Sequence, residues 1–237
     1  MSQVANATIR AAESAFSFVN NDTGYNQAVW LMTQLGLAAG QAKPLEYLRS
    51  QGIDIPDNTS IPGVAVALTE ALDNHSAANG GHGDLGELSQ RALVDAVIQC
   101  MEPKVRQQYL FNMQADDTAR ALADFRKPRE FGQLSREFYS RLTTECMNYF
   151  LSQTLASNLG QGQRFPTMNQ MAQFEQALAT HCKEASAIVE QFSNEWFSKH
   201  RYEEQGNISR DSVRGFASWA LKKMKDELKA GAKTDGQ

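Results

Sequence analysis

The chain has 237 residues and a formal net charge of −4, with 42% hydrophobic and 9% aromatic residues. Val, Ile and Thr, which favour pleated sheets, number only 10, 7 and 12, whereas Ala and Gln, which favour helices, number 30 and 20. This composition argues against sandwiches, barrels and repeated βαβ units, and it supplies enough apolar side chains for a folded core, so we expect an all-α protein.

In the first third of the chain, apolar residues at helical spacing and capping residues define the predicted elements. We predict helices over about residues 2–20, 23–40, 44–52 and 60–75. Asp22 or Thr23 is suited to cap the second helix, Pro44 opens the third, and Ser60 begins the fourth. A glycine-rich stretch over residues 77–86 follows, and its composition is typical of a loop or linker.

Prolines divide the middle of the chain. We predict helices over about residues 87–101, 103–114, 116–126 and 134–159. Pro103 is expected to restart a helix and Pro128 to interrupt one, because proline lacks the backbone N–H that a helix interior needs.

The last third predicts two long helices. Thr167 and Gln170 match a capping box, and no Pro or Gly follows until after Glu204, so we expect one helix of 37 residues, roughly 55 Å long. Its predicted apolar seam comprises Met171, Phe174, Leu178, His181, Ala185, Ile188 and Phe192. A final helix is predicted from Ser209 to Gly231. We expect a multi-helix bundle that ends in a long antiparallel αα-hairpin.

The predicted regions are an N-terminal helical region (1–76), a linker or loop (77–86), a central helical region (87–165), the hairpin (166–231) and a disordered tail (232–237). The same boundaries also fit one continuous domain. The first residues do not resemble a secretory signal, and no run reaches the roughly 20 apolar residues of a membrane helix. Three widely spaced cysteines suit reduced thiols, so we expect a cytoplasmic protein that is not bound to a membrane.

The sequence lacks the motifs of common enzymes. It contains no GxxxxGK[ST], GxSxG or HExxH motif, and no Glu is followed three residues later by His as in di-iron bundles. His75 and His82 do not have the spacing of a recognised metal site. His181 and Cys182 are adjacent, so on a helix their side chains diverge by about 100° and cannot act as a pair. We predict no catalytic residue, metal or cofactor.

Trp219 is the most informative residue of the final helix. It lies about 135° from the centre of the apolar face, together with Ser212 and Gly215, at positions that are normally polar. Because tryptophan is enriched in interface hot spots, we predict that these three residues contact a protein partner or a second copy of the chain. The alternative is that Trp219 packs, with Phe197, inside a wider core of the same chain.

Charge is distributed unevenly along the chain. Residues 199–233 contain nine Lys or Arg and five Asp or Glu, although the whole chain is acidic. Arg214, Lys222, Lys225 and Lys229 form a strip beside the apolar face of the final helix, and such a strip could follow the phosphates of a nucleic acid. A solvated face is the simpler interpretation, because no aromatic platform is evident beside the strip.

The leading hypothesis is a non-enzymatic cytosolic subunit of a larger protein complex, which binds its partner through the C-terminal hairpin. The alternative is a helical nucleic-acid-binding protein, within a nucleoprotein or defence complex, that uses the basic final helix. A third hypothesis is an enzyme whose scattered polar residues form no recognisable motif.

Overall fold

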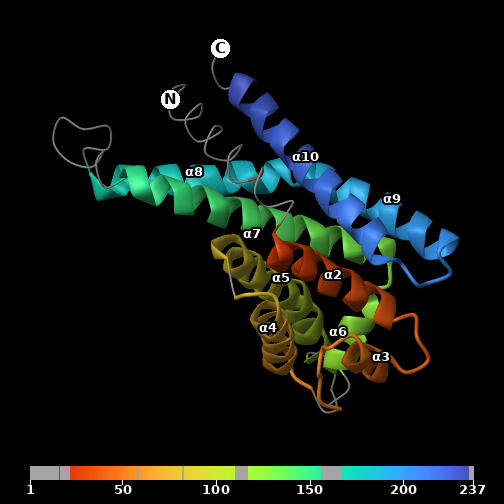
Figure 1. Cartoon of the computed structure of the whole chain (residues 1–237). Coiled ribbons are helices and arrows are strands. Elements are labelled where there is room, and N and C mark those ends of the chain that lie inside the picture. The colour runs from red at the N-terminus through yellow and green to blue at the C-terminus, as the bar shows by residue number, and fades with distance from the viewer. Residues whose placement is uncertain are drawn as a thin grey trace.

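The computed structural model describes Phe16 and residues 22–57, 59–81, 83–109, 117–155 and 167–234 (Figure 1). The predicted all-α class is confirmed, because the regular elements of these residues are helices and none is a strand. The helices are α2 (Thr23–Ala38), α3 (Pro44–Ser50), α4 (Ile61–Ala78), α5 (Asp84–Tyr109), α6 (Asp117–Asp124), α7 (Pro128–Leu155), α8 (Met168–Ala185), α9 (Ala187–Glu203) and α10 (Arg210–Thr234). The helix predicted over residues 2–20 lies outside the described residues, except for Phe16.

Three helices begin where the capping residues predicted. The Asp22 carboxylate accepts a hydrogen bond of 2.8 Å from the Tyr25 N–H at the start of α2. The Ser60 hydroxyl caps α4 and the Thr167 hydroxyl caps α8, each by accepting an N–H three residues ahead. These side chains satisfy backbone donors that have no partner inside the helix.

The prediction of a new helix at Pro103 was wrong. Helix α5 runs without a break from Asp84 to Tyr109 and includes Pro103. Pro103 is exposed, so its ring and missing N–H lie on the solvent side of the helix, where they do not interrupt the packing of the other side. The glycine-rich loop is also shorter than expected, since α4 extends to Ala78 and α5 begins at Asp84.

The single long helix predicted up to Glu204 is divided at Ser186 into α8 and α9. Ser186 is buried, and its hydroxyl donates to the Lys183 carbonyl at 2.7 Å. The Val189 N–H donates to the Ser186 carbonyl only three residues back, which tightens the turn. Local bonding of this kind by a serine bends a helix without needing Pro or Gly, the residues used for the prediction.

The buried side of α8 and α9 also differs from the predicted seam. Of the predicted seam residues, Leu178 and Ala185 are buried, and His181 is half-buried. The other four are half-buried and pack against the core: Met171, Phe174, Ile188 and Phe192. The residues of these helices that enter the core are Leu178, Cys182, Ala185, Val189, Trp196 and Phe197. The break at Ser186 and the contact with α7 set this face, which the heptad spacing alone did not identify.

A tight turn connects α9 to α10. Gln205 and Gly206 have positive φ values of 51° and 82°, which reverse the chain within a few residues. Helix α10 then runs back across α9 and contacts α8, α2 and α7 as well (Figure 1). It extends past Gly231 to Thr234, and residues 235–237 lie outside the described part of the chain.

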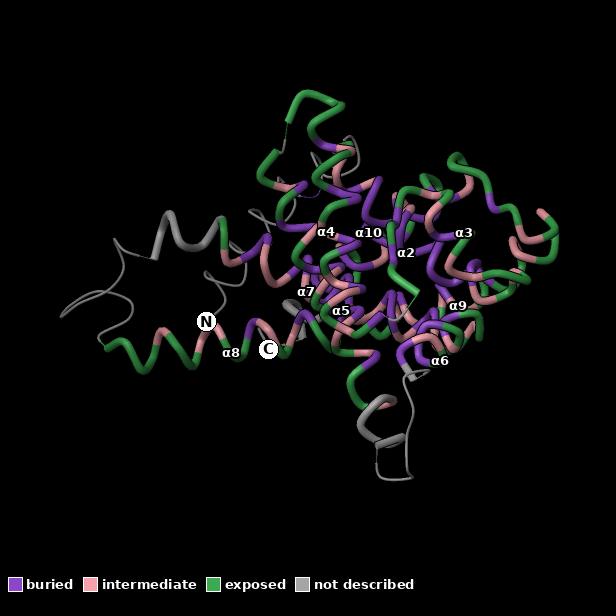
Figure 2. Tube along the Cα trace, turned by 90° about the horizontal axis from the view of Figure 1, so that it is seen from below, coloured by how far each residue is buried: buried purple, intermediate pink, exposed green. Residues whose placement is uncertain are grey.

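One hydrophobic core joins residues from every described helix. Phe131 of α7 lies near its centre, with its ring centroid 4.2 Å from that of Phe197 and 6.2 Å from that of Phe216. Figure 2 shows the buried residues gathered where α2, α5, α7, α9 and α10 meet, while α8 extends outward from this centre. Among the helices described here, none is both long enough and apolar enough to cross a membrane.

Candidate functional site

The inner side of α10 is fixed in the core. Its buried residues are Val213, Phe216, Ala217, Ala220, Leu221, Met224 and Leu228. The Tyr25 hydroxyl donates to the Ala217 carbonyl at 2.9 Å and lies 2.9 Å from the Tyr139 hydroxyl. Burial and the nearby Tyr139 raise the pKa of Tyr25 well above 10.0, so this contact is made by a neutral phenol. These contacts fix the rotation of α10 about its axis, and therefore which of its residues face outward.

Trp219 lies on the outer side of α10. Trp219 is 52% exposed, and among the described large hydrophobic residues of α9 and α10 only Tyr202, at 87%, is more exposed. Gly215, one turn earlier, is also exposed, and no atom of the described residues lies within 4 Å of the position that a Cβ there would occupy. The structure therefore leaves these two predicted interface residues open to a partner.

Ser212, the third predicted interface residue, has a structural contact of its own. Its N–H donates to the Ser209 hydroxyl at 3.2 Å, and the two hydroxyl oxygens lie 2.9 Å apart. It is half-exposed and stabilises the first turn of α10. Ser212 lies on the same side of the helix as Gly215, where it borders the open surface.

Phe197 does not share the surroundings of Trp219. It is fully buried against Phe131, and its ring leaves room only for a glycine at position 36, where a Cβ would lie 2.8 Å from the Phe197 ring. Phe197 is thus a core residue and Trp219 is not, so the alternative in which both lie in one wider core was wrong.

The predicted basic strip lies beside Trp219. The Lys222 ammonium is 4.8 Å from the centroid of the Trp219 ring, a cation–π distance. Arg214 lies at the other end, 3.5 Å from the exposed carboxylate of Asp211. The expectation that no aromatic ring accompanies the strip was wrong, since Trp219 and Lys222 are three residues apart and adjacent on the helix surface.

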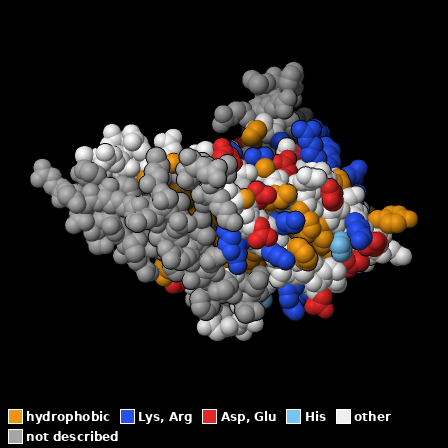
Figure 3. All heavy atoms as spheres, turned by 90° about the horizontal axis from the view of Figure 1, so that it is seen from above, with side chains coloured by type: hydrophobic (Ala, Val, Ile, Leu, Met, Phe, Trp, Pro, Cys, Tyr) orange, Lys and Arg blue, Asp and Glu red, His pale blue; other side chains and the backbone are white. Residues whose placement is uncertain are grey.

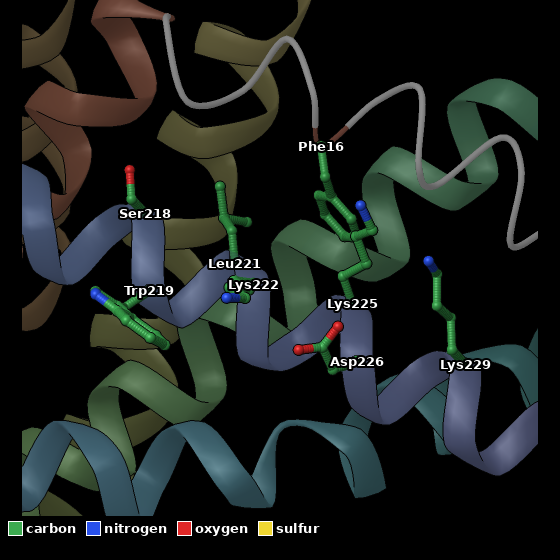
Figure 4. A pocket seen from close by; sticks show the side chains of 8 residues that line it. All are labelled: Phe16, Ser218, Trp219, Leu221, Lys222, Lys225, Asp226 and Lys229. Carbon is green, nitrogen blue, oxygen red and sulfur yellow. The ribbon is translucent and has the colours of Figure 1, made fainter.

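Trp219 and the lysines line one open groove of about 520 Å³. Its lining residues are Phe16, Ser218, Trp219, Leu221, Lys222, Lys225, Asp226 and Lys229. In Figure 4, the Phe16 side chain points toward α10, and the Lys225 side chain extends from α10 toward Phe16. Seen from above, Lys and Arg side chains lie beside exposed hydrophobic ones (Figure 3). We name this groove, together with Gly215 and Ser212, the α10 face.

The sequence did not identify Phe16, Ser218, Leu221 and Asp226 as part of this site. Ser218, Leu221 and Asp226 lie within one or two turns of Lys222, so helical spacing could have placed them beside it. Phe16 is more than 200 residues away from them in the chain, and only the fold brings it to α10.

Two buried cysteines and His200 are held by contacts within the fold. Burial raises the pKa of Cys146 to about 12 and that of Cys182 to about 11, so both stay protonated and are poor nucleophiles at neutral pH. The His200 ring stacks on Trp196 at 4.8 Å between centroids. Within the described ranges, no group of three or more His, Cys, Asp or Glu side chains could hold a metal ion, and His82 lies outside these ranges.

Comparison with known proteins adds no relative. No protein family model matches the chain, and none of the curated proteins or solved structures with which it was compared matches either. The chemistry of its exposed residues is therefore the basis for assigning a function.

Proposed function

We propose that this chain is a non-enzymatic, cytoplasmic subunit of a protein complex, which binds its partner through the α10 face. The observation that carries this proposal is the 52% exposure of Trp219 on a helix whose opposite side is buried in the core. A tryptophan in water gives up a large hydrophobic contribution that burial at an interface would recover.

The groove beside Trp219 supports the same proposal. It places the half-exposed Trp219 beside charged groups from Lys222, Lys225 and Asp226. An apolar centre with a polar margin is the usual composition of a protein interface, where aromatic residues contribute most of the binding free energy.

A photo-crosslinking amino acid at position 219 tests the proposal in the cells that make the chain. The matched control carries the same amino acid at Val66 of α4, which is 56% exposed and lies on a different helix. We expect a discrete protein adduct from position 219 and none of that mass from position 66. An adduct of twice the chain mass would identify the partner as a second copy.

Two results would contradict the proposal. One is the absence of any protein adduct at position 219, and the other is the same set of adducts at both positions. Light scattering after size exclusion, on the wild type and on Trp219→Ala, gives an independent measure, since a partner held by Trp219 should dissociate from the variant.

Nucleic-acid binding is the second candidate. The observation in its favour is that the Lys222 ammonium lies over the Trp219 ring, with Lys225 and Lys229 in the same groove, because single-stranded nucleic acids bind to aromatic rings beside cations. Titration of a fluorescent oligothymidine at two salt concentrations tests it. Binding that weakens with salt and with Lys222→Glu would support this candidate, and no binding at low salt would exclude it.

A further inference from the structure

The glycine on the α10 face differs from the other helical glycines. A Cβ at Gly36 would lie 2.8 Å from Phe197, one at Gly132 would lie 2.7 Å from the Glu190 carbonyl oxygen, and one at Gly24 would lie 2.7 Å from Gly86 Cα. Each of these three glycines lets another part of the chain approach closely. At Gly215, by contrast, the described residues leave the space beside the helix empty.

An exposed glycine inside a helix lowers helix stability relative to alanine. No packing within the described chain compensates for this at Gly215, which lies well inside α10. At Gly24, Gly36 and Gly132, the missing side chain lets the backbone or an aromatic ring of another helix come close. The open space at Gly215 therefore fits a backbone that approaches α10 from outside.

The charges beside Gly215 and Trp219 indicate which side chains the partner presents to α10. Lys222, Lys225 and Lys229 supply three cations to the groove, and Asp226 supplies one carboxylate. A partner with acidic side chains complements this surface, and such complementarity sets the choice of partner and the rate of association. A nucleic acid would use the same cations but not the open space beside Gly215, which fits the close approach of a helix backbone.

We propose that the α10 face binds an amphipathic helix of another protein, one whose apolar stripe is bordered by acidic residues. This rests on the proposed function and specifies its partner. The apolar stripe covers Trp219, the helix backbone passes over Gly215, and the acidic residues pair with Lys222 and Lys225. Helices that dock in this way present apolar residues at positions i, i+3, i+4 and i+7.

Two synthetic helical peptides of about 20 residues test the proposal. Both carry leucines at those positions, and they differ only in that the flanking residues are all Glu in one and all Lys in the other. Binding to the full chain is measured by fluorescence anisotropy at low ionic strength. We expect the Glu peptide to bind at least about fivefold more tightly than the Lys peptide.

Variants of the full chain locate the binding. Trp219→Ala and Gly215→Leu should each weaken binding of the Glu peptide by more than about tenfold. Gly215→Leu should keep the helical circular dichroism and the Tm of the wild type or raise the Tm, because the added side chain enters open space. Lys222→Glu combined with Lys225→Glu should invert the preference toward the Lys peptide, while the control Val66→Ala should leave both affinities unchanged.

Several outcomes would overturn the proposal. Equal binding of both peptides would reject the acidic partner, and binding that tolerates Gly215→Leu would reject the helix passing over that residue. Binding of oligothymidine in preference to the Glu peptide would assign the face to nucleic acid instead. If any of these results is obtained while crosslinks at position 219 persist, only the proposed identity of the partner is wrong. If the crosslinks are absent as well, the proposed function fails with it.

Discussion

The two sides of α10 have opposite relations to the rest of the molecule. On the inner side, Phe216 lies between Trp196 and Phe192, with ring centroids 4.4 Å and 5.7 Å away. On the outer side, Trp219 is about half exposed and the Lys222 ammonium lies 4.8 Å from its ring centroid. Two aromatic residues only three positions apart thus serve different purposes. One stabilises the fold, and the other is available to a partner.

The largest expected difference is in the free energy of unfolding. Phe216→Ala removes a buried ring and leaves a cavity, which should lower that free energy by about 3–5 kcal/mol. Trp219→Ala should lower it by less, about 1 kcal/mol, since about half of the residue is already in water. Urea denaturation of both variants gives the values. A large loss of stability in Trp219→Ala would show that its indole belongs to the core.

A second comparison uses two glycines. Gly132→Ala would place a methyl group 2.7 Å from the Glu190 carbonyl oxygen, so α7 and α9 must move apart, at a cost of about 1–3 kcal/mol. Gly215→Ala meets no described atom and should stabilise α10 by about 0.5–1 kcal/mol. Thermal or urea unfolding should give opposite signs for the two substitutions. The same sign for both would contradict the description of Gly215 as open.

The hydrogen bonds that orient α10 can be separated by two substitutions. Tyr25→Phe leaves the buried Tyr139 hydroxyl without its partner, and we expect a loss of about 1–3 kcal/mol in unfolding free energy. Tyr139→Phe leaves the bond from Tyr25 to the Ala217 carbonyl in place, so its effect should be smaller. Urea denaturation measures both effects. Equal losses of unfolding free energy would mean that the hydrogen bond from Tyr25 to the Ala217 carbonyl adds no stability of its own.

The smallest effect is a decrease of stability at alkaline pH. Cys146 and Cys182 have folded pKa values of about 12 and about 11 against an ordinary value of 9.0, so the unfolded thiols lose their protons first. Their contribution to stability is fully present below pH 9 and is lost as the pH rises toward about 11–12. At pH 9 we expect a loss on the order of 0.4 kcal/mol for each thiol, relative to pH 7.5. Urea denaturation at the two pH values measures it, and the doubly substituted Cys146→Ala, Cys182→Ala protein should show less of it.

The sequence predicted the helical class, the caps at Asp22, Ser60 and Thr167, and the buried side of α10, because each depends on residues within one or two helical turns. It did not predict the break at Ser186, whose cause is one side-chain hydrogen bond to the Lys183 carbonyl. The continuity of α5 through Pro103 depends on where solvent lies, which only the packing of neighbouring helices determines.

The candidate site divides in the same way. Trp219, Gly215 and the lysines were found from their spacing on one helix, whereas Phe16 was not, because its contact with α10 joins distant parts of the chain. The cation–π pair between Lys222 and Trp219 also has local spacing, but the sequence does not fix the side-chain rotamers that bring the ammonium over the ring.

The fluorescence of Trp219 tests the central claim most directly. Subtracting the emission of Trp219→Phe from that of the wild type isolates this indole from Trp30 and Trp196. In the free chain we predict the emission of an indole in contact with water, readily quenched by acrylamide, and a shift to shorter wavelength with loss of quenching once the Glu peptide is bound. Emission at short wavelength and resistance to acrylamide in the free chain would contradict the account, because Trp219 would then already be covered by its own chain.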